Sequence, residues 1–162
     1  MIVRDAEEAD LPGVLTIYND VIARSTAVFS DQPVTLEDRR AWFAQRRSLG
    51  YPVLVAADAQ GVAGFASFGD FRSWPGYRHT VEHSIHVREG VRRSGVGSLL
   101  LEPLLARAAA LGKHVMLAGI DGDNAVSLAF HARFGFVEAG RLREVGYKFG
   151  RFIDLVFLQR AL

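Results

Sequence analysis

The chain has 162 residues, of which 49% are hydrophobic, so we expect one domain with a continuous core that spans residues 1–162. Its 19 basic and 18 acidic residues leave a formal net charge of +1, which argues against a nucleic acid or a membrane as partner. The absence of cysteine excludes disulfides, thiolate metal ligands and a cysteine acyl-enzyme. The charged N-terminal segment does not suit a signal peptide, and no segment approaches the roughly 20 apolar residues of a membrane span, so we expect a cytoplasmic protein.

The N-terminal third predicts a strand and two helices. Residues 1–4 are typical of a short strand, and the apolar residues that follow Asp10, a candidate N-cap, recur at helical spacing. A second helix begins where Thr35 and Asp38 have the spacing of a capping box, and it ends at Gly50.

Strands and helices alternate in the rest of the chain. Two apolar runs flank a short turn and predict a hairpin, and the alternation around Val81 and Ile85 predicts a further strand. A glycine turn then leads into a helix that ends at Gly112. This order predicts an α/β domain with a mixed sheet, in which the remaining elements are strands at 52–58, 61–69, 79–87, 114–120 and 151–162 and a helix at 124–136.

The turn before the third helix, VRRSGVG, is rich in arginine and glycine. Gly95 and Gly97 lack the β-carbons that would keep a phosphate from the backbone, and the free N–H groups at a helix start attract anions. A glycine turn that only redirects the chain is an equally good interpretation of the glycines alone. Leu100 excludes a dinucleotide-binding fingerprint, and the lack of Lys-Ser or Lys-Thr after the second glycine excludes a P-loop.

Several segments resemble one known family. RRSGVG is similar to the Arg/Gln-x-x-Gly-x-Gly/Ala signature of the GCN5-related N-acetyltransferases (GNAT), and NAVSLAFHARFGF resembles their Asn-x-x-Ala/Ser block that ends in aromatic-Gly-Phe. FRSWPGYRHTVEHSIHV, IDGDNAVSLAFHARFGF and VGYKFGRFIDLVFLQ are most similar to the branch with phosphinothricin and methionine sulfoximine or sulfone acetyltransferases. The resemblance covers nearly the whole chain and implies the GNAT fold, an α+β arrangement with a mixed, mostly antiparallel central sheet flanked by helices.

The resemblance also implies acetyl-coenzyme A (acetyl-CoA) as the acetyl donor. In the family, the loop amides grip the pyrophosphate, the preceding strand lines the pantetheine arm and supplies an oxyanion donor, and the asparagine touches the cofactor. Carried onto this chain, the implied cofactor-binding residues are Ile85, His86, Val87, Arg92, Arg93, Ser94, Gly95, Val96, Gly97, Ser98 and Asn124.

His131 is the first candidate catalytic residue. The family usually has a tyrosine seven residues after the asparagine, where it protonates the departing thiolate, and this chain has His131 there, which is similar to the phosphinothricin branch. An imidazole with a reference pKa near ~6.5 suits either donation or acceptance of a proton. The alternative is an ordinary polar residue on the solvent face of its helix.

Glu82 is the predicted general base, acting directly or through a water. An amine must lose a proton before it attacks a thioester, and the resemblance places the thioester beside the strand that carries Glu82. The alternative is a surface carboxylate paired with Arg72 or Arg78.

The acceptor pocket is predicted around the segment FRSWPGYRH, whose arginines suit a carboxylate or a sulfone-like group. Trp74 and Tyr77 belong to this pocket rim, and the alternative is that their rings are packing anchors. Lys148 and Arg151 belong to a segment that resembles the family and could serve the substrate of the same or a partner subunit, with a solvated strand edge as an equally good interpretation. The predicted substrate-binding residues are Arg72, Ser73, Trp74, Arg78, Glu82 and His83.

A metal site is not expected. Strand parity places His79 and His83 on one face and Glu82 and His86 on the other, so these side chains do not converge.

The sequence therefore predicts an N-acetyltransferase that acts on the α-amine of a small amino-acid analogue, by direct transfer in a ternary complex because no cysteine can carry the acetyl group. The resemblance also implies a homodimer. Two alternatives stay open: acetylation of another amine, on a protein or a polyamine, and a non-catalytic sensor that binds acyl-CoA.

Overall fold

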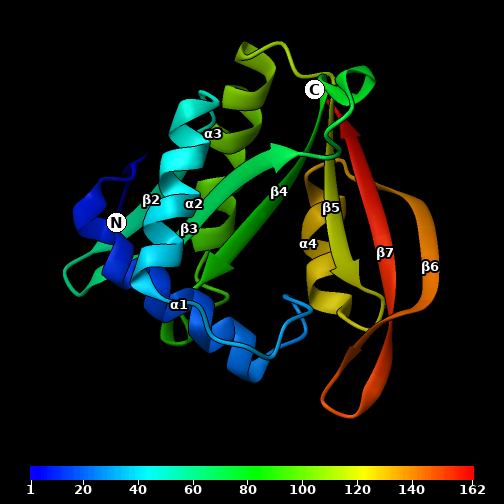
Figure 1. Ribbon diagram of the computed structural model, residues 1–162, viewed down its shortest axis with the longest axis horizontal. Helices are drawn as coiled ribbons and strands as arrows, with labels where there is room; N and C mark the ends of the chain where they lie inside the picture. The colour runs from blue at the N-terminus through cyan, green and yellow to red at the C-terminus, as the bar shows by residue number, and fades with distance from the viewer.

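The computed structural model describes residues 1–162 as one seven-stranded sheet with helices on both faces (Figure 1). The strand order is β1-β2-β3-β4-β5-β7-β6, and only β4 and β5 run parallel to each other. This arrangement is the mixed, mostly antiparallel sheet that the sequence predicts. The strands are β1 (Ile2–Asp5), β2 (Val53–Asp58), β3 (Gly61–Asp70), β4 (Thr80–Val87), β5 (Val115–Asp121), β6 (Val137–Lys148) and β7 (Arg151–Ala161).

Four α-helices and three short 3-10 turns complete the fold. None of the helices is long and apolar enough to cross a membrane. The helices are α1 (Leu11–Arg24), α2 (Leu36–Ser48), α3 (Val96–Ala110) and α4 (Ala125–Arg133), and the 3-10 turns are η1 (Glu8–Asp10), η2 (Pro75–Tyr77) and η3 (Glu89–Val91).

The predicted helix starts have different outcomes. The capping box of α2 is confirmed, because Thr35 Oγ1 accepts from the Asp38 amide at 3.1 Å and the Asp38 carboxylate accepts from the Thr35 amide at 2.7 Å. Asp10 occupies the predicted N-cap position of α1, but its side chain makes no capping hydrogen bond and accepts instead from Arg4 and from the Glu7 amide. These bonds tie β1 to the turn that precedes α1.

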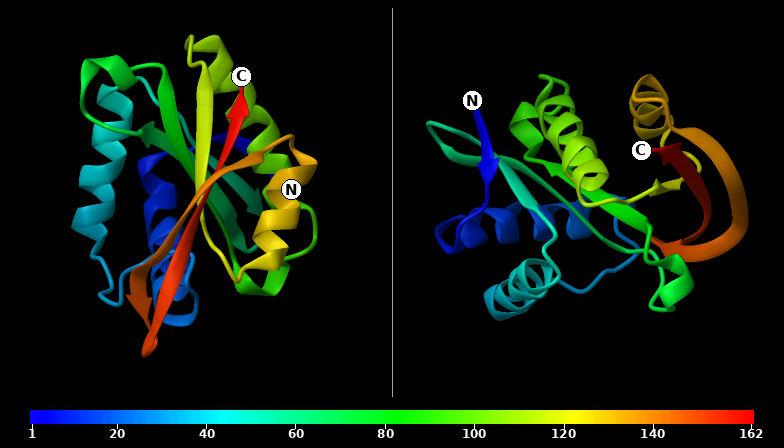
Figure 2. Two further views of the ribbon diagram at one scale, coloured as in Figure 1. Left: turned by 90° about the vertical axis from the view of Figure 1, so that its right-hand side faces the viewer. Right: turned by 90° about the horizontal axis from the view of Figure 1, so that it is seen from above.

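The helices cover the two faces of the sheet in pairs. Figure 2 shows α1 and α2 on one face and α3 and α4 on the other. The core between α3 and the sheet is the larger one, with Leu100, Leu101 and Leu104 fully buried. On the opposite face, Val14 of α1 packs with Phe65 of β3 in a smaller apolar cluster. The sheet is therefore buried on both sides around its central strands.

The parallel pair β4 and β5 opens part-way along its length. The two strands pair only from Thr80 to Glu82 on β4 and from Val115 to Leu117 on β5. Beyond that point they diverge, as Figure 1 shows, so the edge of β4 from His83 to Val87 has no strand beside it. Backbone groups that would otherwise join the sheet are thus available to line a cavity.

The long β6–β7 hairpin extends the sheet beyond β5, and β6 is the one strand that the sequence interpretation did not predict. Most of β6 is exposed, and its pairing with β7 is interrupted between Leu142 and Gly146. Without a buried apolar alternation, the sequence of β6 lacks the usual strand pattern. Because the strand propensity of this sequence is weak, β6 forms through its pairing with β7.

Candidate active site

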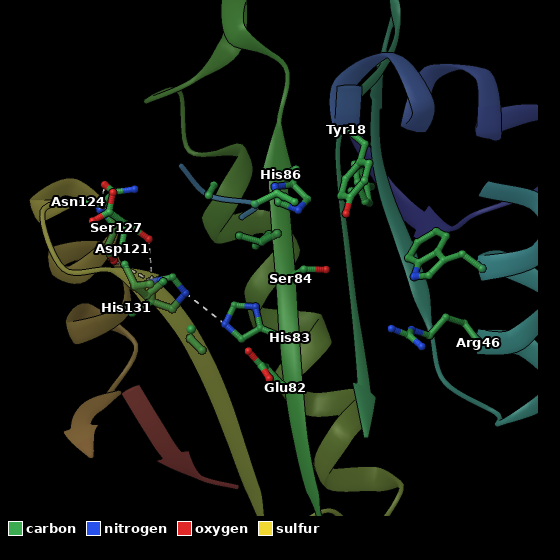
Figure 3. Close-up of a pocket in the computed structure, with 18 of the residues that line it drawn as sticks. Tyr18, Arg46, Glu82, His83, Ser84, His86, Asp121, Asn124, Ser127 and His131 are labelled. Carbon is green, nitrogen blue, oxygen red and sulfur yellow. Dashed lines mark hydrogen bonds between the residues drawn. The ribbon is translucent and has the colours of Figure 1, made fainter. Parts of the chain in front are cut away.

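A cavity of about 410 Å³ lies where β4 and β5 diverge. Figure 3 shows that its lining comes from two sides. We call the side formed by β4, β5 and α4 the strand wall; its polar members are Glu82, His83, Ser84, His86, Asp121, Asn124, Ser127 and His131. We call the side formed by α1 and α2 the helix wall; its members are Tyr18, Arg39, Trp42 and Arg46.

Glu82 is a partly buried carboxylate with no ion-pair partner. The alternative that Arg72 or Arg78 pairs with it is therefore wrong. Its side chain lies over Gly119 of β5, where an added β-carbon would be 2.9 Å from Glu82 Oε1. Burial without a compensating cation raises the pKa of Glu82 above its usual value of 4.5. A carboxylate with a raised pKa is better matched to removing an ammonium proton.

His131 contacts His83 on the strand wall, with 3.2 Å between the two Nε2 atoms (Figure 3). His131 Nδ1 lies 2.7 Å from the Ser127 carbonyl oxygen, and a carbonyl only accepts, so Nδ1 carries a proton. In the neutral ring, His131 Nε2 is then an acceptor and His83 Nε2 is the donor. This assignment leaves His83 Nδ1 unprotonated, and that atom is buried with no hydrogen-bond partner.

Burial keeps both imidazoles neutral. Desolvation, followed by the effect of His131 and His86, lowers the pKa of His83 to about 3, and burial also lowers the pKa of His131. His131 is only 2% exposed, so the interpretation of it as a polar residue on the solvent face of α4 is wrong. As described, the pair has no proton free to give, because both nitrogens of His131 are engaged.

The turn before α3 has the backbone that an anion site needs. The N–H groups of residues 93–98 have no acceptor within the protein, and they converge at the start of the 15-residue helix α3. Arg93 has φ 67° and Gly95 has φ 90°, so two residues of this turn have the left-handed conformation, which glycine adopts most easily. The residues therefore fit the pyrophosphate of acetyl-CoA.

Two predicted members of that turn have additional structural contacts. A β-carbon at Gly97 would lie 3.3 Å from the ring of Phe130, so this glycine also lets α4 approach α3. Arg92 Nε donates to the Val87 carbonyl at 3.2 Å, and its guanidinium lies 3.6 Å from the Asp20 carboxylate. The Arg92 side chain thus fastens the turn to α1.

The remaining predicted cofactor residues lie along the same route. Ile85 and His86 line the cavity, and Val87 follows them at the end of β4. His86 packs against Tyr18 and Phe65, on the opposite face of β4 from His83, which confirms the predicted strand parity. Asn124 lines the cavity as the N-cap of α4, where its Oδ1 accepts from the Ser127 amide at 3.0 Å.

Four of the six predicted acceptor residues, those of the segment FRSWPGYRH, do not line this cavity. Arg72 lies over the ring of Phe71, and the guanidinium of Arg78 donates to the Pro75 carbonyl at 3.1 Å. Ser73 is exposed and Trp74 is 73% exposed, so Trp74 is no packing anchor. Within one chain, the structure brings together Glu82 and His83 from the predicted set and leaves the other four on an exposed connection.

The helix wall is the part of the site that sequence reasoning missed. Its signal is present in α2, where Arg39, Trp42 and Arg46 recur at spacings of three and four and so share one helix face. Arginines on the face that also carries Trp42 are unusual for a helix that packs on a sheet. That pattern would have pointed to a polar cavity under α2.

The connection between α1 and α2 lines the cavity with Ala27 and Val28 and is held by the β6–β7 hairpin. Lys148 is 4% exposed, and its Nζ donates to the carbonyls of Ser25 at 2.6 Å and Val28 at 2.9 Å. Thr26 donates to the Asp121 carboxylate, which also pairs with Arg151 at 3.2 Å. The interpretation of Lys148 as part of a solvated edge is therefore wrong.

Comparison with known proteins agrees with this geometry. Residues 14–136 match the model of the Acetyltransferase (GNAT) family. The chain belongs to this family. It is 51% identical over 161 residues to an L-methionine sulfoximine/L-methionine sulfone acetyltransferase of Pseudomonas aeruginosa, which covers 99% of this chain and 94% of the relative. The predicted family and branch are thus confirmed.

Two further relatives extend the comparison. A phosphinothricin N-acetyltransferase of Streptomyces coelicolor is 38% identical over 163 residues, which covers 99% of this chain and 95% of the relative. The solved structure of the acetyltransferase yncA of Salmonella typhimurium with acetyl-CoA has a TM-score of 0.97 at 43% identity, and covers 99% of this chain and 93% of that chain. The predicted GNAT fold is confirmed by this match and by the sheet order.

Proposed function

We propose that this protein transfers the acetyl group of acetyl-CoA to the α-amine of a small amino acid of the methionine sulfone or methionine sulfoximine type. The family and the names of the most similar relatives support the reaction class and the acceptor class. The observation that carries the proposal is Glu82, a carboxylate without a counter-cation that faces a cavity at the point where β4 and β5 part.

Each requirement of the reaction has a candidate group on this chain. The free amides of residues 93–98 bind the pyrophosphate, and the unpaired edge of β4 offers the N–H groups of Ile85 and Val87 toward the thioester oxygen, because strand alternation directs the N–H of His86 to β3. Glu82 removes the ammonium proton of the acceptor. When bound, acetyl-CoA supplies the activated carbonyl and the thiolate leaving group. Since the chain has no cysteine, transfer is direct, and initial-rate plots against both substrates should intersect rather than run parallel.

The candidate proton donor for the departing thiolate is His131. His131 has no proton to spare in the neutral pair with His83, so it can act as the donor only when the pair carries an extra proton. Burial opposes that charged form. His131 as thiolate donor remains a prediction, and a polar role that orients the strand wall is the role its hydrogen bonds support.

A homodimer is part of the proposal. The β6–β7 hairpin exposes several large apolar side chains next to one another in the sequence, which is unusual for a surface with no partner. Light scattering after gel filtration should give a mass near twice 17.8 kDa. The exposed residues are Leu142, Val145, Tyr147, Phe149 and Phe152.

An acceptor comparison tests the proposed function. Release of free CoA should be measured with methionine sulfone, methionine sulfoximine, spermidine and a lysine peptide at equal concentration. The proposal expects the highest kcat/KM with one of the two amino acids. A higher value with spermidine or the peptide would reassign the acceptor, and binding of acetyl-CoA without turnover of any amine would identify a sensor.

A further inference from the structure

Two arginines of the helix wall lack the acceptors that buried guanidinium groups normally have. Arg39 is only 9% exposed, its side chain donates no hydrogen bond, and no carboxylate lies within 4.0 Å of its guanidinium. Arg46 has an unpartnered buried Nε, and its Nη1 reaches only Gln45 Oε1 at 3.4 Å. Arg39 is buried and Arg46 is half-buried with a buried Nε. A cation that is withdrawn from water without a partner is costly, so these two arginines beside one cavity favour an anion from outside the chain.

The Arg46 guanidinium lies over Gly69, the residue of β3 that is paired with the predicted general base Glu82. A β-carbon at Gly69 would be 2.7 Å from Arg46 Nη2 and 2.9 Å from its Cζ, so the guanidinium rests directly on this glycine of β3. Gly69 is the register partner of Glu82 on β4. In Figure 3, Arg46 points from α2 into the cavity toward the side that holds Glu82. A cation and a carboxylate thus sit over neighbouring strands on one face of the sheet.

Arg39 is held in place by aromatic rings rather than by acceptors. Its Cζ lies 4.2 Å from the centre of the Tyr18 ring and 4.8 Å from that of Trp42. These rings fix the plane of the guanidinium and leave its N–H edge unused. Burial, with Arg39 next in effect, lowers the pKa of the nearby His86 to about 4, so His86 is neutral and adds no second positive charge beside Arg39.

The one carboxylate that influences Arg46 is already engaged. Asp70 accepts from the Tyr51 hydroxyl, and Tyr51 accepts in turn from Lys113 Nζ at 2.8 Å. Asp70 therefore belongs to a separate network at the end of β3 and leaves Arg46 without an ion pair.

We propose that Arg39 and Arg46 bind the α-carboxylate of the amino-acid acceptor while Glu82 faces its ammonium group. This inference rests on the proposed function and names the groups that select an amino acid over a simple amine. A planar carboxylate matches the N–H edge of a guanidinium, and its full charge compensates the buried cations. A neutral sulfone or sulfoximine group would leave them uncompensated. The predicted Arg72 and Arg78 lie on an exposed connection outside this cavity.

The test compares methionine sulfone with methionine sulfone amide, which has the same amine and sulfone but no carboxylate charge. Wild-type enzyme should favour the acid, and in Arg46→Gln and Arg39→Gln the ratio of kcat/KM for acid to amide should fall by about 10- to 100-fold, the scale for a lost charge-assisted contact. The matched controls are Arg47→Gln and Arg40→Gln, exposed neighbours on the same helix, which should keep the wild-type ratio.

Gly69→Ala gives an independent arm, because it displaces the Arg46 guanidinium without changing any charge. It should lower the same ratio, and thermal unfolding checks that each variant folds. An unchanged ratio in folded Arg39 and Arg46 variants would overturn the inference. The inference would also be overturned if the variants kept the acid-to-amide ratio of kcat/KM but no longer distinguished methionine sulfone from norleucine. The arginines would then bind the sulfone group and not the carboxylate. If wild-type enzyme acetylates no amino acid at all, the proposed function itself fails.

Discussion

The strand wall and the helix wall of the cavity differ in how they handle charge. On the strand wall, burial raises the pKa of Glu82 and lowers those of His83 and His131, so its groups tend toward neutrality. On the helix wall, Arg39 and Arg46 remain cations without partners, because a guanidinium does not deprotonate in proteins. From this contrast we infer that the strand wall carries out proton transfer and that the helix wall binds a fixed negative charge.

Glu82→Gln gives the largest expected effect and tests the strand wall alone. Loss of a positioned base should lower kcat by roughly 10²- to 10⁴-fold. The Kd of acetyl-CoA should be almost unchanged, because the pyrophosphate site lies at the start of α3. Steady-state kinetics and calorimetric titration of acetyl-CoA measure the two quantities. A variant that loses cofactor binding along with turnover would show that Glu82 has a structural role.

Gly97→Val tests whether the turn before α3 serves the ligand or only the fold. The added side chain should weaken acetyl-CoA binding by at least about tenfold, or ~1.4 kcal/mol. Because position 97 also touches Phe130, the double variant Gly97→Val with Phe130→Ala supplies the control. Persistent weak binding in the double variant supports the phosphate site. Recovery of wild-type affinity there would assign the glycine to helix packing alone.

Lys148→Met tests how far the helix wall depends on its support. The amine holds the Ser25 and Val28 carbonyls, so its loss should loosen the connection that lines the acceptor side. We expect KM for the acceptor to rise several-fold, on the scale of about 1 kcal/mol per lost hydrogen bond, with KM for acetyl-CoA unchanged. Equal changes in both KM values would place the effect elsewhere.

The neutral histidine pair predicts a modest dependence of stability on pH. The folded-state pKa of His83 lies below the unfolded value of 6.5, so the unfolded chain binds more protons on acidification. The free energy of unfolding should therefore fall from pH 7 toward pH 4, as the pH passes below 6.5 and approaches the folded-state pKa of about 3. Urea unfolding at several pH values should show a shallower fall in His83→Gln. An identical slope in this variant would exclude His83 as a contributor.

The two walls also differ in how well the sequence predicts them. The strand wall follows from contiguous signals: alternation around Glu82 marks a strand, glycines mark the anion turn, and Asn124 to His131 spans one helix. The helix wall depends on how α1 and α2 pack on the sheet, which periodicity does not orient in space. Arg39 therefore looks like a surface residue in the sequence although it is buried. Likewise, the sequence predicts that Arg72 and Arg78 bind the acceptor, but both residues lie outside the cavity.

The most direct test of the central claim is the pH dependence of kcat/KM for methionine sulfone in wild-type enzyme and in Glu82→Gln. Glu82 must be ionised to accept the ammonium proton, so wild-type activity should fall on the acid side with a midpoint above 4.5, in the direction of the raised pKa. That acid limb should be absent from the residual activity of the variant. The same limb in both proteins would contradict Glu82 as the base.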